Sequence, residues 1–174
     1  MEAKKYTLII PMPPSVNAIY KSIVVGKKLI RCKSKVYYEY DKIIKDWTHE
    51  NFDDLKSVKD QIKTLINTGS VLSIDRYFCF HKESLFTKMD TIKRLDVTNR
   101  IKVLDDTVMR LFEIDDKYIW FGYEEKVILS PSDDECVIVD IAPVEMFDYK
   151  NVISIKDGKG YKDRKPRITE RDSA

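Results

Sequence analysis

The chain alternates between short runs of β-forming residues and longer segments whose apolar residues recur at helical spacing. Tyr6 to Ile10 is a short apolar run that ends at Pro11, so it predicts a first strand. Ser22 to Arg31 places two apolar stretches around a Gly-Lys-Lys sequence at 26–28. That pattern is typical of a small hairpin with a basic tip.

Two helices are predicted next, followed by a strand. The first covers residues 35–50, with Ser34 as its N-cap and an apolar stripe at Val36, Tyr40, Ile43 and Trp47. The second ends near residues 67–69 and carries an apolar face at Leu55, Val58, Ile62 and Leu65. Residues 70–80 are rich in β-formers, so they predict a strand.

The next stretch, 81–95, is polar and irregular, and its length suggests a functional loop or an insertion. A third helix follows, with Thr98 as its predicted N-cap and an apolar stripe at Ile101, Leu104, Val108 and Leu111. Asp115 and Asp116 break that pattern. Residues 118–129 and 136–141 predict two strands joined as a hairpin across 130–134.

The order β, hairpin, α, α, β, α, β, β predicts an α+β fold, with a small mixed β-sheet packed against helices. At 174 residues and 43% hydrophobic, the chain is long enough to bury one core and too short to prefer two. We therefore expect one domain over residues 1–149. Residues 150–174 have few apolar and many basic side chains, so they predict a basic C-terminal tail.

Composition narrows the chemistry. The 31 basic and 29 acidic residues leave a net charge of +2, so any affinity for a polyanion depends on how charge is distributed. Three widely separated cysteines offer neither a disulfide framework nor a zinc pair, and two histidines make a His-rich site unpromising. A bound metal would need carboxylate ligands. No apolar segment approaches the length of a membrane span, which predicts a cytoplasmic protein without membrane contact.

Carboxylates gather around the third helix. Asp96 precedes its N-terminus, Asp106 shares a face with Thr98 and Lys102, and Asp115 and Asp116 follow its end. Clustered carboxylates can hold Mg²⁺ or Mn²⁺ for phosphodiester hydrolysis, with a lysine donating to a phosphate oxygen. This arrangement requires the strand after Asp116 to fold back beside Asp96. The alternative is structural: an Asp at a helix start is usually a cap, and Asp-Asp after a helix is usually a turn.

A local cationic surface is predicted between residues 21 and 45. Only Glu39 and Asp41 oppose its basic residues, which are Lys21, Lys27, Lys28, Arg31, Lys33, Lys35, Lys42 and Lys45. Such a surface suits the phosphates of a nucleic acid, although an ordinary solvated helix face has the same composition. The Tyr20 side chain beside it is of a kind that often serves as a core ring.

Two separated blocks resemble the RusA family of Holliday junction resolvases. The first is Ile10-Pro-Met-Pro-Pro-Ser-Val-Asn17 with Tyr20. The second is Asp96-x-Thr98-Asn99-x-x-Lys102-x-x-x-Asp106, followed by Asp115, Asp116, a β-run and Lys126. Both occur in the family's order, and the resemblance covers about residues 7 to 142. It does not cover the tail.

The resemblance implies a homodimeric nuclease that uses Asp residues and Mg²⁺ or Mn²⁺ to cut four-way DNA junctions in recombination and repair. By position, Asp96 and Asp116 match the family's catalytic metal ligands and Lys102 its catalytic lysine. Asp106 and Asp115 are further candidate metal ligands. The expected DNA contacts are Asn17, Tyr20, Lys21, Lys27, Lys28, Arg31, Asn99 and Arg100.

One departure from the family pattern matters. The resolvase motif has a second Asp where this chain has Thr98, a neutral and weaker ligand. The site therefore loses a charge unless Asp106 or Asp115 compensates. Two alternatives follow: a catalytically weak protein that binds branched DNA as an accessory, or a protein-interaction domain whose charged patches pair with a partner.

Overall fold

The structure is a computed structural model that describes residues 5–144, so the predicted tail at 150–174 lies outside the described residues. Its main element is a five-stranded mixed sheet. In order across the sheet, the strands are β1 (Tyr6–Pro11), β7 (Cys136–Val144) and β4 (Val71–Phe80), with β5 (Ile119–Phe121) and β6 (Glu124–Ile128) both paired beyond β4. β7 runs antiparallel to β1 and β4, whereas β5 and β6 run parallel to β4.

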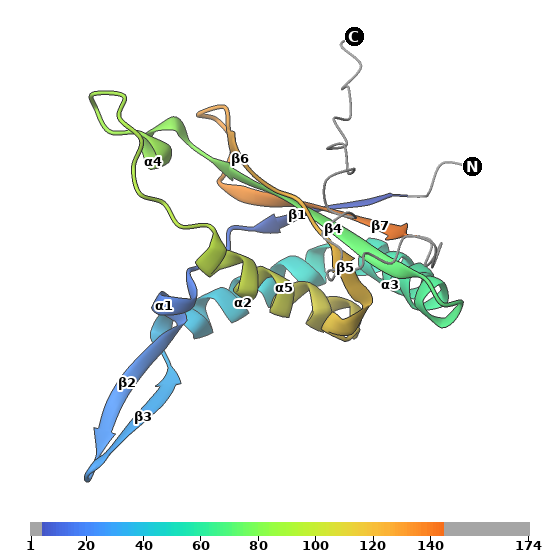
Figure 1. Ribbon diagram of the computed structural model, residues 1–174, viewed down its shortest axis with the longest axis horizontal. Coiled ribbons are helices and arrows are strands. Elements are labelled where there is room, and N and C mark those ends of the chain that lie inside the picture. Colours follow the sequence, from blue (N-terminus) through green and yellow to red (C-terminus); the bar gives the residue numbers. More distant parts are fainter. Residues whose placement is uncertain (1–4, 145–174) are drawn as a thin grey trace, which may run out of the picture.

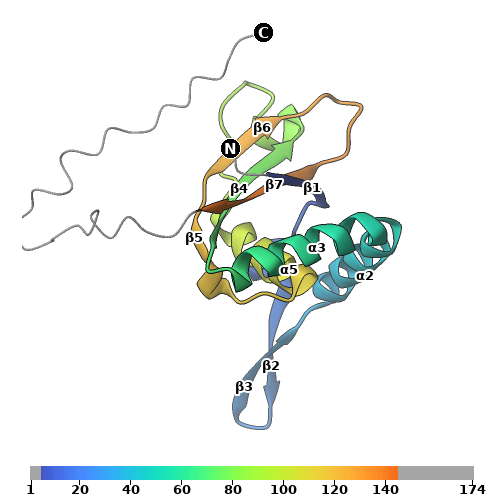
Figure 2. The ribbon, with the colours of Figure 1, turned by 90° about the vertical axis from the view of Figure 1, so that its right-hand side faces the viewer.

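The long helices all lie on one face of this sheet (Figures 1 and 2). The helical elements are α1 (Val16–Ile19), α2 (Lys35–Glu50), α3 (Phe52–Asn67), α4 (Lys82–Leu85), α5 (Thr98–Phe112) and a 3₁₀ turn, η1 (Asp116–Tyr118). The predicted α+β class with a small mixed sheet is confirmed for the described residues, and so are the first strand and the three long helices. No helix among residues 5–144 is long and apolar enough to span a membrane.

The core lies between the sheet and the helices. Strand register places Leu8 opposite Val139 and Ile10 opposite Val137, and these side chains share the helix-facing side with Phe78. α5 packs against them through Leu104, Val108 and Phe112, all fully buried. Alternation along β1, with every second residue buried, follows from the two-residue period of a strand.

The predicted apolar stripe of α2 is partly wrong. Tyr40 and Ile44 are the buried residues of this helix, whereas Ile43 is 49% exposed and Val36 also faces solvent. Tyr40 fixes which face is inward, and Ile44 lies one helical turn after it, at the i+4 spacing that keeps two residues on one face.

The predicted hairpin of the last two strands is also wrong, because β4 lies between β6 and β7. β4 is buried along its whole helix-facing side and at both ends of its other side, as is typical of a central strand with a neighbour at each edge. β6 alternates exposed and half-buried residues and includes two glutamates and a lysine, a composition suited to a sheet edge. The connection through α5 supplies the long crossover that a parallel neighbour of β4 requires.

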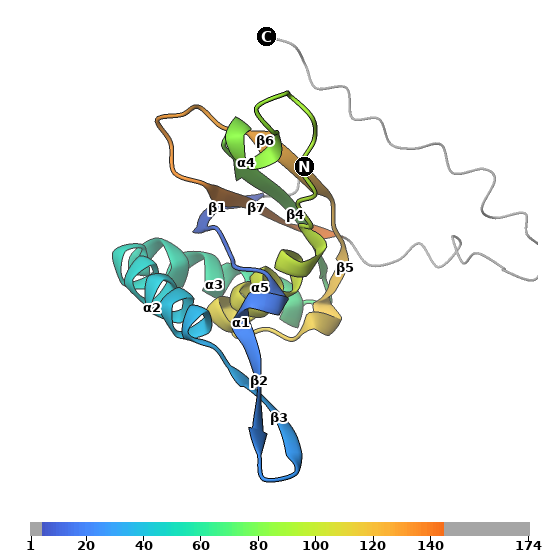
Figure 3. The same ribbon diagram turned by 90° about the vertical axis from the view of Figure 1, so that its left-hand side faces the viewer.

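A second, two-stranded sheet is formed by the predicted basic hairpin, β2 (Tyr20–Val25) and β3 (Lys28–Lys33). It projects away from the layers of the fold, as Figures 1 and 3 show. Gly26 occupies its turn at a φ of +62°, a left-handed conformation that glycine adopts without a steric penalty. The hairpin prediction and its basic tip are therefore confirmed.

Candidate functional site

The two motif blocks of the sequence meet at the N-terminal end of α5. Arg100, on the first turn of α5, donates a hydrogen bond from Nη1 to the carbonyl oxygen of Pro13, 87 positions earlier in the chain. Its guanidinium also lies over the Phe80 ring, 5.9 Å from the centroid, and burial lowers its pKa. Arg100 was predicted to contact DNA. In this structure its guanidinium ties the Pro-Pro-Ser block to α5.

Asp96 organises the start of the helix. Its Oδ1 accepts a hydrogen bond from the backbone amide of Thr98 at 2.9 Å, and its Oδ2 accepts one from the Asn99 side-chain amide at 2.7 Å. The prediction that Thr98 caps the helix is wrong: Thr98 is the first helical residue, and Val97 at the N-cap position provides no side-chain bond. Asp96 satisfies a free amide instead, and the helix dipole favours its negative charge there.

Lys102 and Asp106 follow on the exposed side of α5. Both are solvent-exposed, whereas the residues that α5 buries are Val103, Leu104, Thr107, Val108 and Phe112. Lys102 is therefore available to a ligand and is not part of the core. Asn99, predicted to contact DNA, is half-buried and uses its amide group to bind Asp96.

Asp115 and Asp116 lie at the opposite end of α5. The helix has 15 residues, which corresponds to about 22 Å at 1.5 Å per residue. Asp115 accepts a hydrogen bond from the backbone amide of Lys117. This hydrogen bond and a second one with the Asp116 side chain lower the pKa of Asp115. Asp116 begins η1. These two residues therefore form a turn, and one copy of the chain does not bring them beside Asp96.

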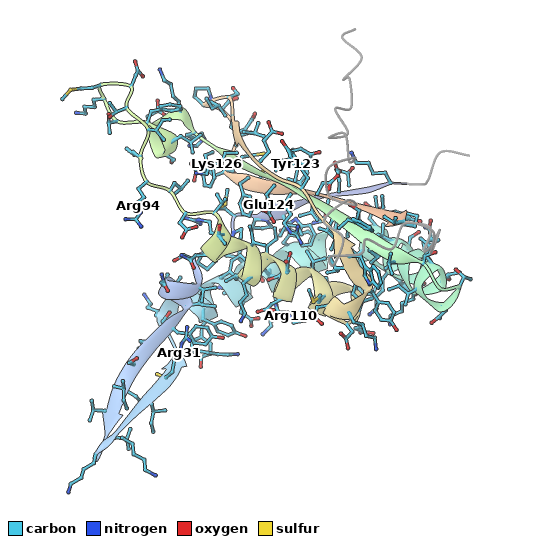
Figure 4. The ribbon with its side chains drawn as sticks, in the orientation of Figure 1. Arg31, Arg94, Arg110, Tyr123, Glu124 and Lys126 are labelled. Atoms are coloured by element: carbon cyan, nitrogen blue, oxygen red, sulfur yellow. The ribbon has the colours of Figure 1, made fainter. Side chains whose placement is uncertain are left out.

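The chain after Asp116 does fold back toward Asp96, and the side chain that it brings there is a lysine. Lys126 on β6 donates a hydrogen bond from Nζ to the carbonyl oxygen of Leu95 at 2.7 Å. Figure 4 shows Lys126 on β6, Arg94 on the loop that leads into α5, and Arg31 on the hairpin. The returning strand therefore brings a positive charge to this end of α5.

The predicted carboxylate set does not form one metal site within a single copy. Among residues 5–144, no group of three or more His, Cys, Asp or Glu side chains is placed to hold a metal ion. Mg²⁺ often binds one or two protein carboxylates together with substrate phosphate oxygens. Asp96 suits that smaller role, because each of its oxygens keeps a lone pair beyond the bond that it already accepts.

The base of the hairpin adjoins this end of α5. The Ser34 hydroxyl and amide donate to the carbonyl oxygens of Ala18 and Ile19, which fixes the hairpin to α1. The Arg31 guanidinium lies 4.1 Å from the centroid of the Tyr20 ring, so Tyr20 is an exposed platform and not a core ring. The remaining predicted DNA contacts here are all exposed: Asn17, Lys21, Lys27 and Lys28.

An internal ion pair was missed by the sequence reasoning. Arg76 is 4% exposed on the helix-facing side of β4 and donates from Nε to Asp105 Oδ1 at 2.8 Å, with Glu124 3.8 Å away. Burial raises the pKa of Asp105, although the Arg76 charge opposes that shift. A charged residue inside the apolar run of residues 71–80 was the signal that could have predicted it. Because Arg76 neutralises Asp105, this pair is structural.

No protein-family model matches this chain, and no curated protein matches it closely enough to count as a relative. The functional assignment therefore depends on the residues and contacts described above.

Proposed function

We propose that this protein is a structure-specific endonuclease that binds branched DNA, such as a four-way junction, at the N-terminal end of α5 and cuts it there. The observation that carries the proposal is the contact between the two motif blocks, which the Arg100–Pro13 hydrogen bond joins across 87 positions. Both blocks resemble the RusA family, and their meeting in space is what a shared substrate site requires.

The charge around this end of α5 supports a phosphate ligand. Lys102 is exposed on the first turns of the helix, and Lys126 and Arg94 lie on the elements beside it. The hairpin contributes further cations on the other side, and in Figures 1 and 3 the start of α5 lies between the hairpin and the α4 segment. Cations grouped in this way release counterions from DNA when they bind it.

The proposed roles at this site differ among the predicted residues. Asp96 would hold Mg²⁺ or Mn²⁺ together with phosphate oxygens of the substrate, and the metal would supply a Lewis acid for the developing charge. Lys102 would donate a hydrogen bond from its ammonium group to a phosphate oxygen of the bound DNA. Within one copy of the chain, α5 separates Asp96 from the other proposed ligands, Asp106, Asp115 and Asp116. These residues keep their proposed metal role only if a second copy of the chain brings one of them close to Asp96.

A homodimer is part of the same proposal, since paired cuts in a four-way junction need two sites. Sedimentation of the pure protein would measure it, and a monomer at all concentrations that still cuts both strands would contradict it.

A binding-only function is the second candidate, and two observations favour it. Thr98 stands where the family motif has a carboxylate, and Asp115 and Asp116 lie at the opposite end of α5 from Asp96. A chain with a single well-placed carboxylate would still recognise branched DNA while cutting it weakly. It would then act as an accessory in recombination or repair.

One experiment separates these functions. The purified protein is incubated with a labelled four-way junction in EDTA, in Mg²⁺ and in Mn²⁺, together with Asp96→Asn and the control Asp60→Asn. Asp60 is an exposed residue of α3, on a different element from the site. Cleavage that requires metal and is lost only in Asp96→Asn supports the nuclease. Binding without cleavage supports the accessory role, and the absence of both refutes each proposal.

A further inference from the structure

The tip of the β2–β3 hairpin carries an exposed apolar pair. Val24 and Leu29 are directly opposite in the strand register, and 73% and 72% of their surfaces are exposed. Side chains alternate between the two faces of the ribbon, so this pair shares a face with Ser22 and Arg31 and then with Tyr20 and Lys33. The other face carries the less exposed pair Ile23 and Ile30. One face therefore combines a cationic, aromatic base with an apolar tip.

The charge of the hairpin indicates the kind of partner that this face fits. Residues 20–34 contain no Asp or Glu, and their five basic residues are Lys21, Lys27, Lys28, Arg31 and Lys33. The only aromatic ring among them, Tyr20, already lies beneath the Arg31 guanidinium. A ribbon with this charge attracts a polyanion, and a two-stranded ribbon has dimensions that the major groove of DNA admits.

The hairpin is also placed so that its tip can reach away from the body of the protein. Its base is held by the two Ser34 hydrogen bonds to α1, while its strands pair only with each other among the described residues. A lone two-stranded ribbon is marginally stable in water. A ligand that packs against the exposed apolar pair would stabilise it, and bases offer apolar faces of the right kind.

We propose that Val24 and Leu29 insert into DNA at a point where base pairing or stacking is already interrupted, while the basic residues of the hairpin hold the flanking phosphates. This inference rests on the DNA-binding part of the proposed function and is independent of cleavage. In an intact duplex, apolar side chains that insert in this way must first separate stacked bases, which costs free energy. At a branch point the stacking is already interrupted, so that cost is smaller. The pair would therefore give the protein its preference for branched over linear DNA.

The test measures binding in EDTA, so that no strand is cut. A four-way junction carrying 2-aminopurine at its branch point reports unstacking by fluorescence, and a linear duplex with the same label is the reference substrate. The variant Val24→Thr/Leu29→Thr removes apolar surface but keeps residues that favour strands. Its matched control, Ile23→Thr/Ile30→Thr, makes the same change on the opposite face. Circular dichroism melts verify that both variants remain folded.

We expect wild type and control to raise the fluorescence of the junction, and the tip variant to lose that rise. The tip variant should bind the junction about tenfold more weakly, as the loss of buried apolar surface predicts, with unchanged affinity for the linear duplex. Its salt dependence should match that of wild type, because no charge is altered. A single change, Leu29→Thr, should give an intermediate affinity and serves if the double variant unfolds.

The outcomes separate this inference from the proposed function. If wild type binds no DNA, both are refuted. If wild type prefers the junction and the tip variant prefers it equally, only the inference is refuted and the proposed function stands. If the tip variant instead turns a sedimenting dimer into a monomer, the hairpin docks on a second copy of the chain, and the inference is again overturned.

Discussion

The Nζ atom of Lys126 lies 2.7 Å from the carbonyl oxygen of Leu95, the residue directly before Asp96. This hydrogen bond joins an edge strand to the segment that enters α5, and it places a positive charge beside the proposed phosphate site.

Replacing this lysine should affect DNA more than folding. In Lys126→Met, the exposed Leu95 carbonyl can bond water, so stability should change by less than about 1 kcal/mol. Junction affinity should fall, and the magnitude of the salt slope should drop by about one, the value for one lost phosphate contact. Lys56→Met on α3 is the matched control and should leave the slope unchanged. An equal slope for both variants would remove Lys126 from the DNA surface.

Adding the missing carboxylate tests the metal proposal. Thr98→Asp places an acidic residue where the similar RusA motif has one, near Asp96 and in the first turn of α5, where the helix dipole favours a negative charge. We expect unchanged stability and faster cleavage at limiting Mg²⁺ than in wild type. The measurement is cleavage rate against Mg²⁺ concentration, with Thr98→Asn as the uncharged control. Equal rates for both variants would argue against metal binding at this position.

The Arg76–Asp105 pair should be needed for folding. Arg76→Met should destabilise the protein by about 3 kcal/mol, because it leaves a largely buried carboxylate without its partner. Burial already raises the pKa of Asp105, and removing Arg76 should raise it further. The folded state then binds a proton that the unfolded state has released, so the deficit should shrink as pH falls from 7 toward 4. Urea unfolding at both pH values measures it, and Arg76→Met/Asp105→Asn should show no such pH dependence.

Glu113 should contribute stability that acid removes. It follows the last residue of α5 at a φ of +54° and pairs with Lys59 and Lys63, whose hydrogen bonds, together with their charges, lower its pKa from 4.5 to about 2. A depressed carboxylate pKa stabilises the fold above the unfolded value, and the effect disappears as pH falls from 4.5 toward 2. Wild type should therefore exceed Glu113→Gln in stability at pH 7 and approach it at pH 3. A difference that stays constant would show that these exposed ion pairs contribute nothing.

Gly122 should tolerate no side chain. It separates β5 from β6, and a Cβ atom built there would lie 2.7 Å from the Ile74 carbonyl oxygen and 2.6 Å from Arg76 Nη1. Both contacts are too close, and the carbonyl belongs to a central strand that cannot move freely. Gly122→Ala should lower stability by about 1–3 kcal/mol, the usual effect of overpacking. A thermal melt unchanged by this substitution would show that the β5–β6 connection is pliable.

Local patterns in the sequence were sufficient to predict the long helices but not to predict which strands pair with each other. The stripe through Leu55 and Ile62 predicts α3 because a helix repeats within a few residues, and that repeat needs no knowledge of the rest of the chain. The pairing of β6 with β4 depends on residues nearly fifty positions apart, which no local window contains. The prediction of Thr98 as the helix cap failed for a different reason. Asp96 and Thr98 are both residue types that cap helices, and only the backbone conformation at Val97 decides which of them bonds to the free amides.

The proposed site was limited in the same way. Proximity of Asp96 and Asn99 follows from the helix itself, so this part of the site could be predicted from spacing. The separation of Asp116 from Asp96 also follows from the predicted helix between them, whereas the side chain that the returning strand β6 brings beside Leu95 depends on strand pairing that spacing does not give. Arg76 was overlooked although its charge is conspicuous in an apolar strand, and its partner Asp105 lies directly beside the Asp106 that was selected.

The position of β7 between β1 and β4 sets the time at which the protein can fold during synthesis. β1 is made first and β7 last among the described strands, yet they are neighbours. At about 5–20 residues per second, roughly 6–25 seconds separate their appearance. Once β4 has also been made, β1 and β4 have no strand between them until β7 appears, and their apolar faces have no complete sheet to join. Because α2 and α3 are made before β4, they are the first long helices available to cover the apolar face of β1 until β7 is complete.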